Sequence, residues 1–151
     1  MKFSSPVIAP LQVIPVDFTC DGREISPPLV WNGLPPGTES LVVICHDPDT
    51  VQGEWVHWIC YDIPAACKGL PEGVPKTDNI PLGGRQGIND FLKVGYGGPC
   101  PPSGKHTYVF ELYAIDCSLD LTAGKSREEV QQAMQGHILE HAEFAAFYTR
   151  S

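Results

Sequence analysis

Proline and glycine are spread along the whole chain and limit the elements that it can form. The 151 residues include 15 Pro and 15 Gly. Proline fixes φ and removes a backbone donor, and both residue types interrupt regular structure. Many turns between short segments favour strands over long helices. A chain of this length buries a sizeable core as one unit, so residues 1–151 are interpreted as a single domain.

The charge of the chain argues against two classes of partner. The formal net charge is −8 at pH 7. A nucleic-acid partner requires clustered Lys and Arg, and an anionic membrane surface attracts basic segments. No segment approaches the length of apolar sequence that a spanning helix needs, and Pro6, Pro10 and Pro15 interrupt any apolar run of secretory length. The sequence therefore predicts a cytoplasmic protein that binds no nucleic acid and does not insert into a membrane.

The cysteines are even in number but form no C-x-x-C pair. They are Cys20, Cys45, Cys60, Cys67, Cys100 and Cys117. Cys45 and Cys60 lie in apolar runs, where a reduced cysteine behaves as a small hydrophobic residue. Without an export signal, we expect reduced thiols rather than a disulfide framework.

Hydrophobic patterning predicts a mainly β protein. Strands are expected at residues 11–19, 28–31, 40–46, 55–63 and 106–116, where β-branched and aromatic residues lie between turn signals. Ser126 and Glu129 have capping-box spacing and predict a helix start. Residues 141–149 fit either element, and the alternation of small and aromatic residues favours a strand. The predicted class is a two-sheet β-sandwich with one or two peripheral helices.

Two histidines at strand starts are the main candidates for chemistry. Side chains alternate along a strand, so Trp55 and His57 are expected on one face, together with Ile59 and Tyr61. His106 and Tyr108 share a face about 7 Å apart at two residues' rise. If these faces meet near Asp47, four hydrogen-bonding groups converge. An imidazole beside a carboxylate favours its charged form, which donates twice, so the set predicts a site for a small anion.

Other readings of the same residues stay open at this stage. Asp47-Pro48-Asp49 is also typical of a plain turn, and a single strand histidine is more often structural. His57, His106 and Asp47 have the composition of a metal site, and Cys100 near His106 is a candidate nucleophile. A serine hydrolase is disfavoured because the chain has no G-x-S-x-G elbow.

Several segments, taken together and in order, resemble the phosphatidylethanolamine-binding protein family, and more closely its prokaryotic Raf-kinase-inhibitor-like branch. The segments are Asp47-Pro48-Asp49, Glu54-Trp55-x-His57-Trp58, Gly95 to Pro102 (GYGGPCPP), His106-x-Tyr108, Asp21-Gly22 with Ile25 to Leu29 (ISPPL) and Trp31, and Gly136 to Leu139 (GHIL). Each piece alone is common, whereas the combination is specific and covers nearly the whole chain.

The resemblance implies a β-sandwich-like fold with a small cavity for phosphate or carboxylate groups. It implies that Asp47, Trp55 and His57 form one wall, that His106 and Tyr108 form the other, and that the loop around Gly98, Cys100, Pro101 and Pro102 is the rim. It further implies a non-enzymatic protein without cofactor or metal, which binds phosphate, acetate or a phospholipid headgroup. Inhibition or modulation of a kinase or protease is an activity that the resemblance also suggests. A homodimer is expected, with residues 142–148 as one candidate interface. The alternative is a metal-dependent or His/Asp hydrolase that uses the same pocket.

Overall fold

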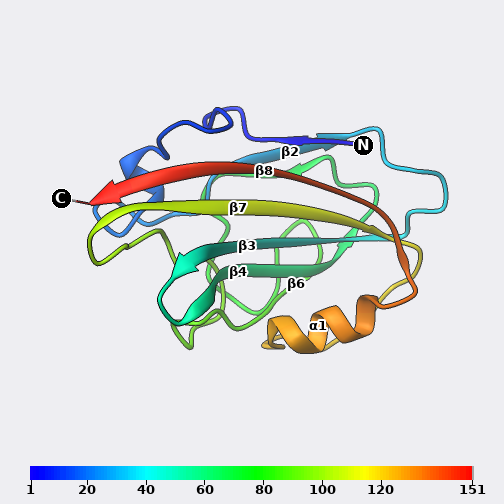
Figure 1. Cartoon of the computed structure of the whole chain (residues 1–151). Helices are drawn as coiled ribbons and strands as arrows, with labels where there is room; N and C mark the ends of the chain where they lie inside the picture. Colours follow the sequence, from blue (N-terminus) through cyan, green and yellow to red (C-terminus); the bar gives the residue numbers. More distant parts are fainter. Residues whose placement is uncertain (151) are drawn as a thin grey trace.

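Two antiparallel sheets make up the body of the protein in the computed structural model, which describes residues 1–150 (Figure 1). The small sheet has the order β1-β2-β5, and the large sheet has the order β6-β4-β3-β7-β8. The strands are β1 (Lys2–Ser4), β2 (Leu29–Asn32), β3 (Ser40–Thr50), β4 (Gly53–Pro64), β5 (Gly69–Leu70), β6 (Arg85–Gln86), β7 (Gly104–Ile115) and β8 (Ile138–Arg150). The predicted mainly β, two-sheet class is confirmed.

The two faces of the large sheet are covered differently. One face packs against the small sheet, and the core between them includes Phe3, Leu29, Trp31, Leu41, Val43, Trp58, Phe110, Leu112 and Phe144. The other face packs against helix α1 (Arg127–Met134), whose Val130 and Met134 cover Val42, Ile44 and Ile59. Figure 1 shows α1 on the side of the large sheet away from β2. The continuous apolar run of β3 follows from this burial on both faces.

The helix begins where the sequence predicts. The Ser126 hydroxyl accepts a hydrogen bond from the Glu129 amide at 3.2 Å, and the Glu129 carboxylate accepts one from the Ser126 amide at 3.2 Å. This capping box satisfies two amides that the first turn leaves without partners. The helix ends at Met134, just before Gly136, whose φ is +81°.

Most predicted strands are present, but residues 11–19 form none. Pro10 and Pro15 flank this segment, and Val16–Phe18 turn into a short 3₁₀ helix, η1. Residues 11–14 instead lie along the outer edge of β8, where the Leu11 amide donates to Ala145 O at 2.7 Å and the Ile14 amide to Phe147 O at 2.7 Å. The missing donors of the flanking prolines keep this pairing short.

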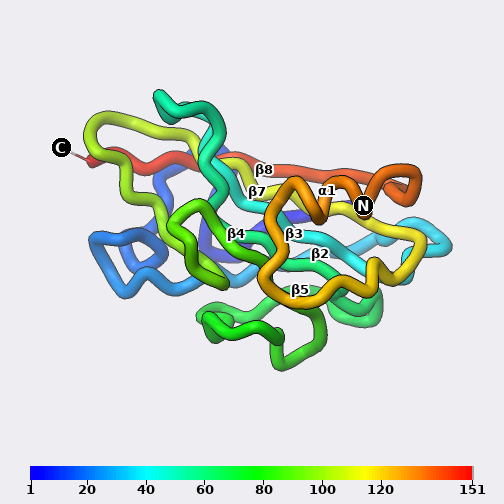
Figure 2. Tube along the Cα trace, turned by 90° about the horizontal axis from the view of Figure 1, so that it is seen from below, coloured from blue at the N-terminus to red at the C-terminus, as the bar shows by residue number. Residues whose placement is uncertain are grey.

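Residues 142–148 belong to β8, as the alternation of their side chains indicates. Phe144 and Ala146 are buried between the sheets, and the outer backbone edge of this half of β8 is occupied by residues 11–14. A dimer formed by extending the sheet through residues 145–147 would have to displace this segment. In Figure 2 the start of the chain and the end of β8 lie at opposite ends of the molecule.

Cys20 and Cys100 form a disulfide, so the prediction of six reduced thiols is wrong for this pair. The S–S distance is 2.06 Å and the Cα–Cα distance is 5.4 Å. Cys45, Cys60, Cys67 and Cys117 are free, and burial raises the pKa of the Cys45 and Cys60 thiols. The two bonded cysteines are 80 residues apart, and only the fold brings these two loops together. The expected cytoplasmic location rested partly on reduced thiols and loses that support.

Candidate functional site: a cavity at the ends of three adjacent strands

A cavity of about 370 Å³ lies where β4, β3 and β7 reach the proline-rich loop. Eight of the nine residues predicted for the site line it: Asp47, Trp55, His57, Cys100, Pro101, Pro102, His106 and Tyr108. They converge because β3 pairs with both β4 and β7 in antiparallel fashion. The end of β3 therefore lies between the starts of β4 and β7, which are distant in sequence. The remaining lining residues are Asp49, Thr50, Val51, Gln52, Phe91 and Ser103.

A β-bulge turns His57 toward the cavity. Cys45 is opposite Trp58 while His46 is opposite Val56, so His57 is the extra residue of β4. Simple alternation predicts His57 on the same face as Ile59 and Tyr61, and this is wrong, because Ile59 and Tyr61 pack on the α1 side. Bulges re-aim side chains beside functional sites. Here the bulge lets Trp55, His57 and Trp58 all face the inner side of the sheet.

Asp47 holds His106 in one orientation. Asp47 is 3% exposed, and its Oδ2 lies 2.6 Å from His106 Nδ1. Its second oxygen, Oδ1, accepts from the Asp49 amide at 2.7 Å, and Asp49 in turn accepts from the Thr107 amide at 2.9 Å. Because a carboxylate can only accept, Nδ1 of His106 carries the proton. The other ring nitrogen, Nε2, has no protein partner among residues 1–150, and the residue lines the cavity.

His57 is fixed by the backbone of the following loop. Its Nδ1 donates to Gly97 O at 2.6 Å, and the Gly97 amide donates to His57 O at 2.9 Å. Burial lowers the pKa of His57, and the Gly97 bond and nearby carboxylates oppose this in part. The ring stands edge-on to Tyr108 and Phe91, with centroids 5.2 and 5.4 Å away. Gly97 is required beside Phe91, because a Cβ there would lie 2.5 Å from the ring.

Tyr108 supplies a neutral donor. Burial raises the pKa of its hydroxyl well above the usual value, so the group stays protonated at physiological pH. Its hydroxyl makes no hydrogen bond to the protein within residues 1–150, although the residue is 1% exposed.

Sequence reasoning missed Phe91, since nothing in the local pattern of residues 87–95 marks it. It completes an apolar wall with Trp55, and the two rings meet edge-on at 5.5 Å.

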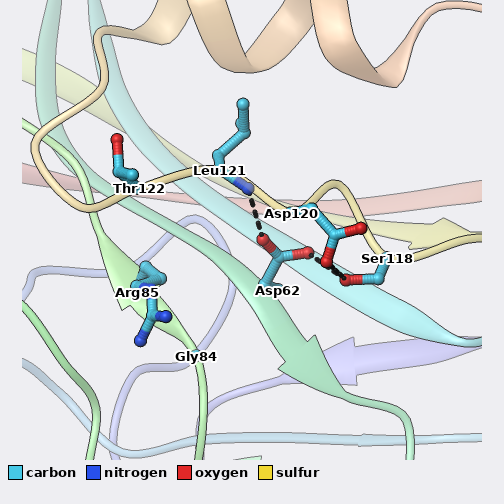
Figure 3. Close-up of a pocket in the computed structure, with 7 residues that line it drawn as sticks. All are labelled: Asp62, Gly84, Arg85, Ser118, Asp120, Leu121 and Thr122. Atoms are coloured by element: carbon cyan, nitrogen blue, oxygen red, sulfur yellow. Dashed lines mark hydrogen bonds between the residues drawn. The ribbon is translucent and has the colours of Figure 1, made fainter.

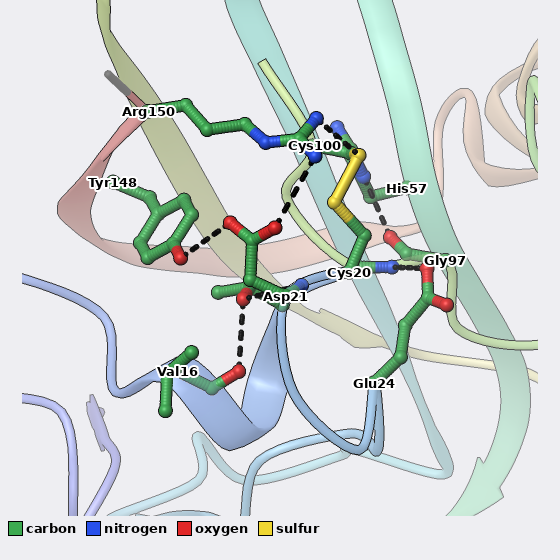
Figure 4. The surroundings of a disulfide bond; sticks show 11 residues. Val16, Cys20, Asp21, Glu24, His57, Gly97, Cys100, Tyr148 and Arg150 are labelled. Atoms are coloured by element: carbon green, nitrogen blue, oxygen red, sulfur yellow. Dashed lines mark hydrogen bonds and ion pairs between the residues drawn. A yellow bond between two sulfur atoms is a disulfide. The ribbon is translucent and has the colours of Figure 1, made fainter.

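Gly98 is not part of the cavity lining. Its amide donates to Glu24 Oε1 at 3.1 Å and is therefore not free to reach an anion. Figure 4 shows the surroundings: the disulfide joins Cys100 of the rim to Cys20, while Arg150 and Tyr148 approach Asp21. With its sulfur in this bond, Cys100 has no thiol to act as a nucleophile.

A second hollow, of about 380 Å³, lies between the end of β4, β6 and the loop before α1 (Figure 3). Its lining includes Asp62, Arg85 and Ser118. The Asp62 carboxylate already accepts from the Leu119 amide at 2.7 Å and the Leu121 amide at 3.2 Å. Asp62 thus connects the loop to the sheet.

Comparison with known proteins finds relatives that match nearly the whole of this chain. The model of the family described as "Phosphatidylethanolamine-binding protein" matches residues 4–149. A UPF0098 protein of Methanothermobacter thermautotrophicus is 50% identical over 137 residues, 91% of each chain. A UPF0098 protein of Pyrococcus horikoshii is 43% identical over 99% of this chain and 77% of its own length.

Two solved structures share the fold over almost the whole chain. A putative phosphatidylethanolamine-binding protein homolog from Chlamydia trachomatis has a TM-score of 0.91 at 36% identity, covering 99% of this chain and 97% of its own. Escherichia coli YbcL, described as a member of the mammalian family, has a TM-score of 0.91 at 30% identity, covering 99% and 98%. Sequence, fold and the family model agree, and the chain belongs to the phosphatidylethanolamine-binding protein family.

Proposed function

We propose that the protein binds a small anionic ligand, bearing a phosphate or carboxylate group, in the cavity between β4 and β7. The observation that carries the proposal is the set of three polar groups without protein partners that line one cavity: His57 Nε2, His106 Nε2 and the Tyr108 hydroxyl. These groups belong to residues that line a concave, partly apolar cavity, and a guest that accepts hydrogen bonds can pair with them there.

The histidines can donate to an anion although the chain carries a net charge of −8. His57 Nδ1 and His106 Nδ1 are both engaged as donors, so each Nε2 becomes a donor only when its ring is protonated. An anion in the cavity stabilises the protonated rings, and binding is therefore coupled to proton uptake. Asp47 supports this by orienting His106 through its Nδ1.

The walls set the class of ligand further. Trp55, Phe91 and Pro101 line the cavity beside the donors, and the volume of about 370 Å³ lies at the lower end of small-molecule sites. A ligand with one anionic head and a short apolar or aliphatic part fits both features. Phosphoethanolamine, a phospholipid headgroup, and simple carboxylates such as acetate are such ligands.

The proposal is binding without catalysis, and it leaves the partner protein unspecified. Inhibition or modulation of a kinase or protease, a homodimer and a cytoplasmic location remain predictions from the sequence. A ligand-filled cavity gives such a partner a surface that changes with occupancy. No helix within residues 1–150 is long and apolar enough to cross a membrane.

The test is a calorimetric titration of the purified protein with inorganic phosphate, phosphoethanolamine and acetate in separate experiments. We expect saturable binding of one equivalent, weakened about tenfold or more in Asp47→Asn, because His106 loses a charged hydrogen bond worth roughly 1.5–3 kcal/mol. His137→Gln is the matched control, since His137 also pairs with an aspartate, Asp116, at 2.8 Å but lies outside the cavity.

The outcomes separate the sources of the anion. Tighter binding of phosphoethanolamine than of phosphate identifies a headgroup as the better ligand, and equal affinity identifies the phosphate group alone. Unchanged affinity in Asp47→Asn, or equal loss in His137→Gln, contradicts the proposed site. Absence of saturable binding for all three anions contradicts the proposed function itself.

A further inference from the structure

One wall of the anion cavity is a short segment that has no regular structure. This rim segment, residues 100–103, lies between Pro99 and the start of β7 at Gly104, and all four of its residues line the cavity. Pro101 and Pro102 have no backbone donor. Across residues 1–150, no hydrogen bond to or from the backbone of the rim segment is found. The strands that form the other walls are fixed by their sheet, whereas this wall is not.

The disulfide holds the rim segment in place. It joins Cys100, the first residue of the segment, to Cys20, and Figure 4 shows Arg150 beside the bonded sulfur atoms. Cys20 is a fixed anchor, because its amide donates to Pro99 O at 3.1 Å and the neighbouring Asp21 pairs with Arg150 at 3.3 Å. The contact of Arg150 Nη1 with Cys100 Sγ, at 3.3 Å, is the only side-chain hydrogen bond to the segment within residues 1–150.

The disulfide lies where a reductant can reach it. Both cysteines are partly exposed, in contrast to the buried free thiols of Cys45 and Cys60. The guanidinium of Arg150 places a positive charge beside the Cys100 sulfur. Such a charge stabilises a thiolate, which is the leaving group in thiol–disulfide exchange. The surroundings of the bond therefore favour its cleavage by a dithiol with Cys100 as the leaving sulfur.

We propose that reduction of the Cys20–Cys100 disulfide releases the rim segment and weakens anion binding, so that the cavity responds to the redox state of its surroundings. The proposal rests on the anion-binding function proposed above. One thiolate of a dithiol attacks Cys20 Sγ, the S–S bond breaks, and Cys100 leaves as a thiolate that takes up a proton. The second thiolate of the dithiol then displaces Cys20, so two electrons and two protons pass from the reductant, which becomes a disulfide.

Two physical effects lower the affinity of the reduced form. A released rim segment must be ordered again when the anion binds, and this ordering costs conformational entropy. A thiolate at Cys100 also places a negative charge in the lining of a site for anions. The donors His57, His106 and Tyr108 lie on strands and keep their positions, so we expect the affinity to be lowered rather than abolished.

Calorimetry with inorganic phosphate tests the coupling in the full-length protein. The oxidised form is compared with protein that has been reduced with dithiothreitol and desalted without oxygen. We expect reduction to weaken phosphate binding at least about tenfold, which is the effect of ordering roughly one residue, and reoxidation to restore it. Cys20→Ala/Cys100→Ala should bind more weakly than the oxidised wild type and should not respond to dithiothreitol. Cys67→Ala is the matched control and should respond as the wild type does, because Cys67 forms no crosslink.

Thermodynamic linkage gives a reciprocal measurement. If reduction lowers the affinity for phosphate, saturating phosphate must lower the equilibrium constant for reduction by the same factor. Mixtures of reduced and oxidised dithiothreitol, followed by alkylation of the thiols and mass spectrometry, measure this constant with and without phosphate. We expect a decrease of at least about tenfold in the wild type, equal to the ratio of the two affinities.

An NMR relaxation measurement without ligand separates this proposal from the proposed function. Upon reduction the amides of Cys100 and Ser103 should lose order, whereas the Gly98 amide, which is bound to Glu24, should not. Equal phosphate affinity of the oxidised and reduced forms, or unchanged order of the two rim amides, overturns the redox proposal. Absence of phosphate binding in both forms overturns the proposed function. Loss of order at the rim then still supports its release by reduction.

Discussion

Removal of the Cys20–Cys100 disulfide should lower the free energy of unfolding by about 4.5 kcal/mol. In the chain-entropy model, a crosslink removes about 2.1 + 1.5R ln n cal/mol/K from the unfolded chain, where n is the loop length. The two cysteines are 80 residues apart. This loop gives about 15 cal/mol/K, or about 4.5 kcal/mol at 25 °C. The double variant Cys20→Ala/Cys100→Ala realises the change without leaving a thiol at the cavity rim.

The effect is expected to act on the unfolded chain, because the two loops have other connections in the folded state. The Cys20 amide donates to Pro99 O at 3.1 Å, and the Tyr96 hydroxyl donates to Phe18 O at 2.6 Å. The Gly98 amide also binds Glu24. The folded double variant should therefore keep the contact between the two loops. Its loss of stability should come mainly from a larger number of conformations open to the unfolded chain.

Urea denaturation of the oxidised wild type and of the double variant measures the difference. Besides a lower midpoint, we expect a steeper dependence on urea in the variant, since its unfolded chain exposes more surface. Cys67→Ala is the control, because Cys67 is partly buried but forms no crosslink. A thiol titration of denatured, non-reduced wild type should count four free thiols. Six free thiols, or equal stability of the two proteins, would refute the reasoning.

Two further predictions concern the anion cavity. Sulfate does not change its own protonation near neutral pH, and its affinity for the cavity should increase as the pH falls and the histidines gain protons. Because burial lowers the pKa of His57, this increase in affinity should continue below pH 6.5, the ordinary pKa of histidine. An NMR titration with sulfate from about pH 8 to about pH 5 tests this, and an affinity that does not depend on pH contradicts it. Tyr108→Phe removes one neutral donor and should weaken phosphate binding about 2- to 12-fold, the equivalent of about 0.5–1.5 kcal/mol for one hydrogen bond. Calorimetry measures the affinity. Tyr113→Phe, on the opposite face of the sheet, is the control and is expected to bind phosphate as the wild type does.

The sequence indicated the class of fold because its local signals agree with one another. Proline and glycine separate short β-branched and aromatic segments, and this pattern requires strands and turns. The Ser126 capping box marks one helix, and its apolar stripe requires a surface to cover. Local signals failed at residues 11–19, where apolar content predicted a strand but Pro10 and Pro15 limit pairing to a few bonds along β8.

The candidate site could be named from the residue types but not assembled from them. Asp47, His57, His106 and Tyr108 were recognisable as an anion-binding set, and the order β4-β3-β7 was needed to bring them together. The bulge at His57 depends on register between strands, and simple alternation therefore placed the ring with the wrong neighbours. Phe91 enters the cavity from a loop whose path is set by contacts distant in sequence, such as the close approach to Gly97.

The amino-acid sequence by itself determined the strand-rich class, the helix start and the chemistry of the side chains, because these depend on residues close together in the chain. Only the tertiary structure decided that Cys20 bonds to Cys100, that the Gly98 amide donates to Glu24, and that Glu111 lies opposite Glu143. Each of these pairings joins segments at least 30 residues apart. Their geometry follows from how both sheets pack around one core, and no local pattern encodes it.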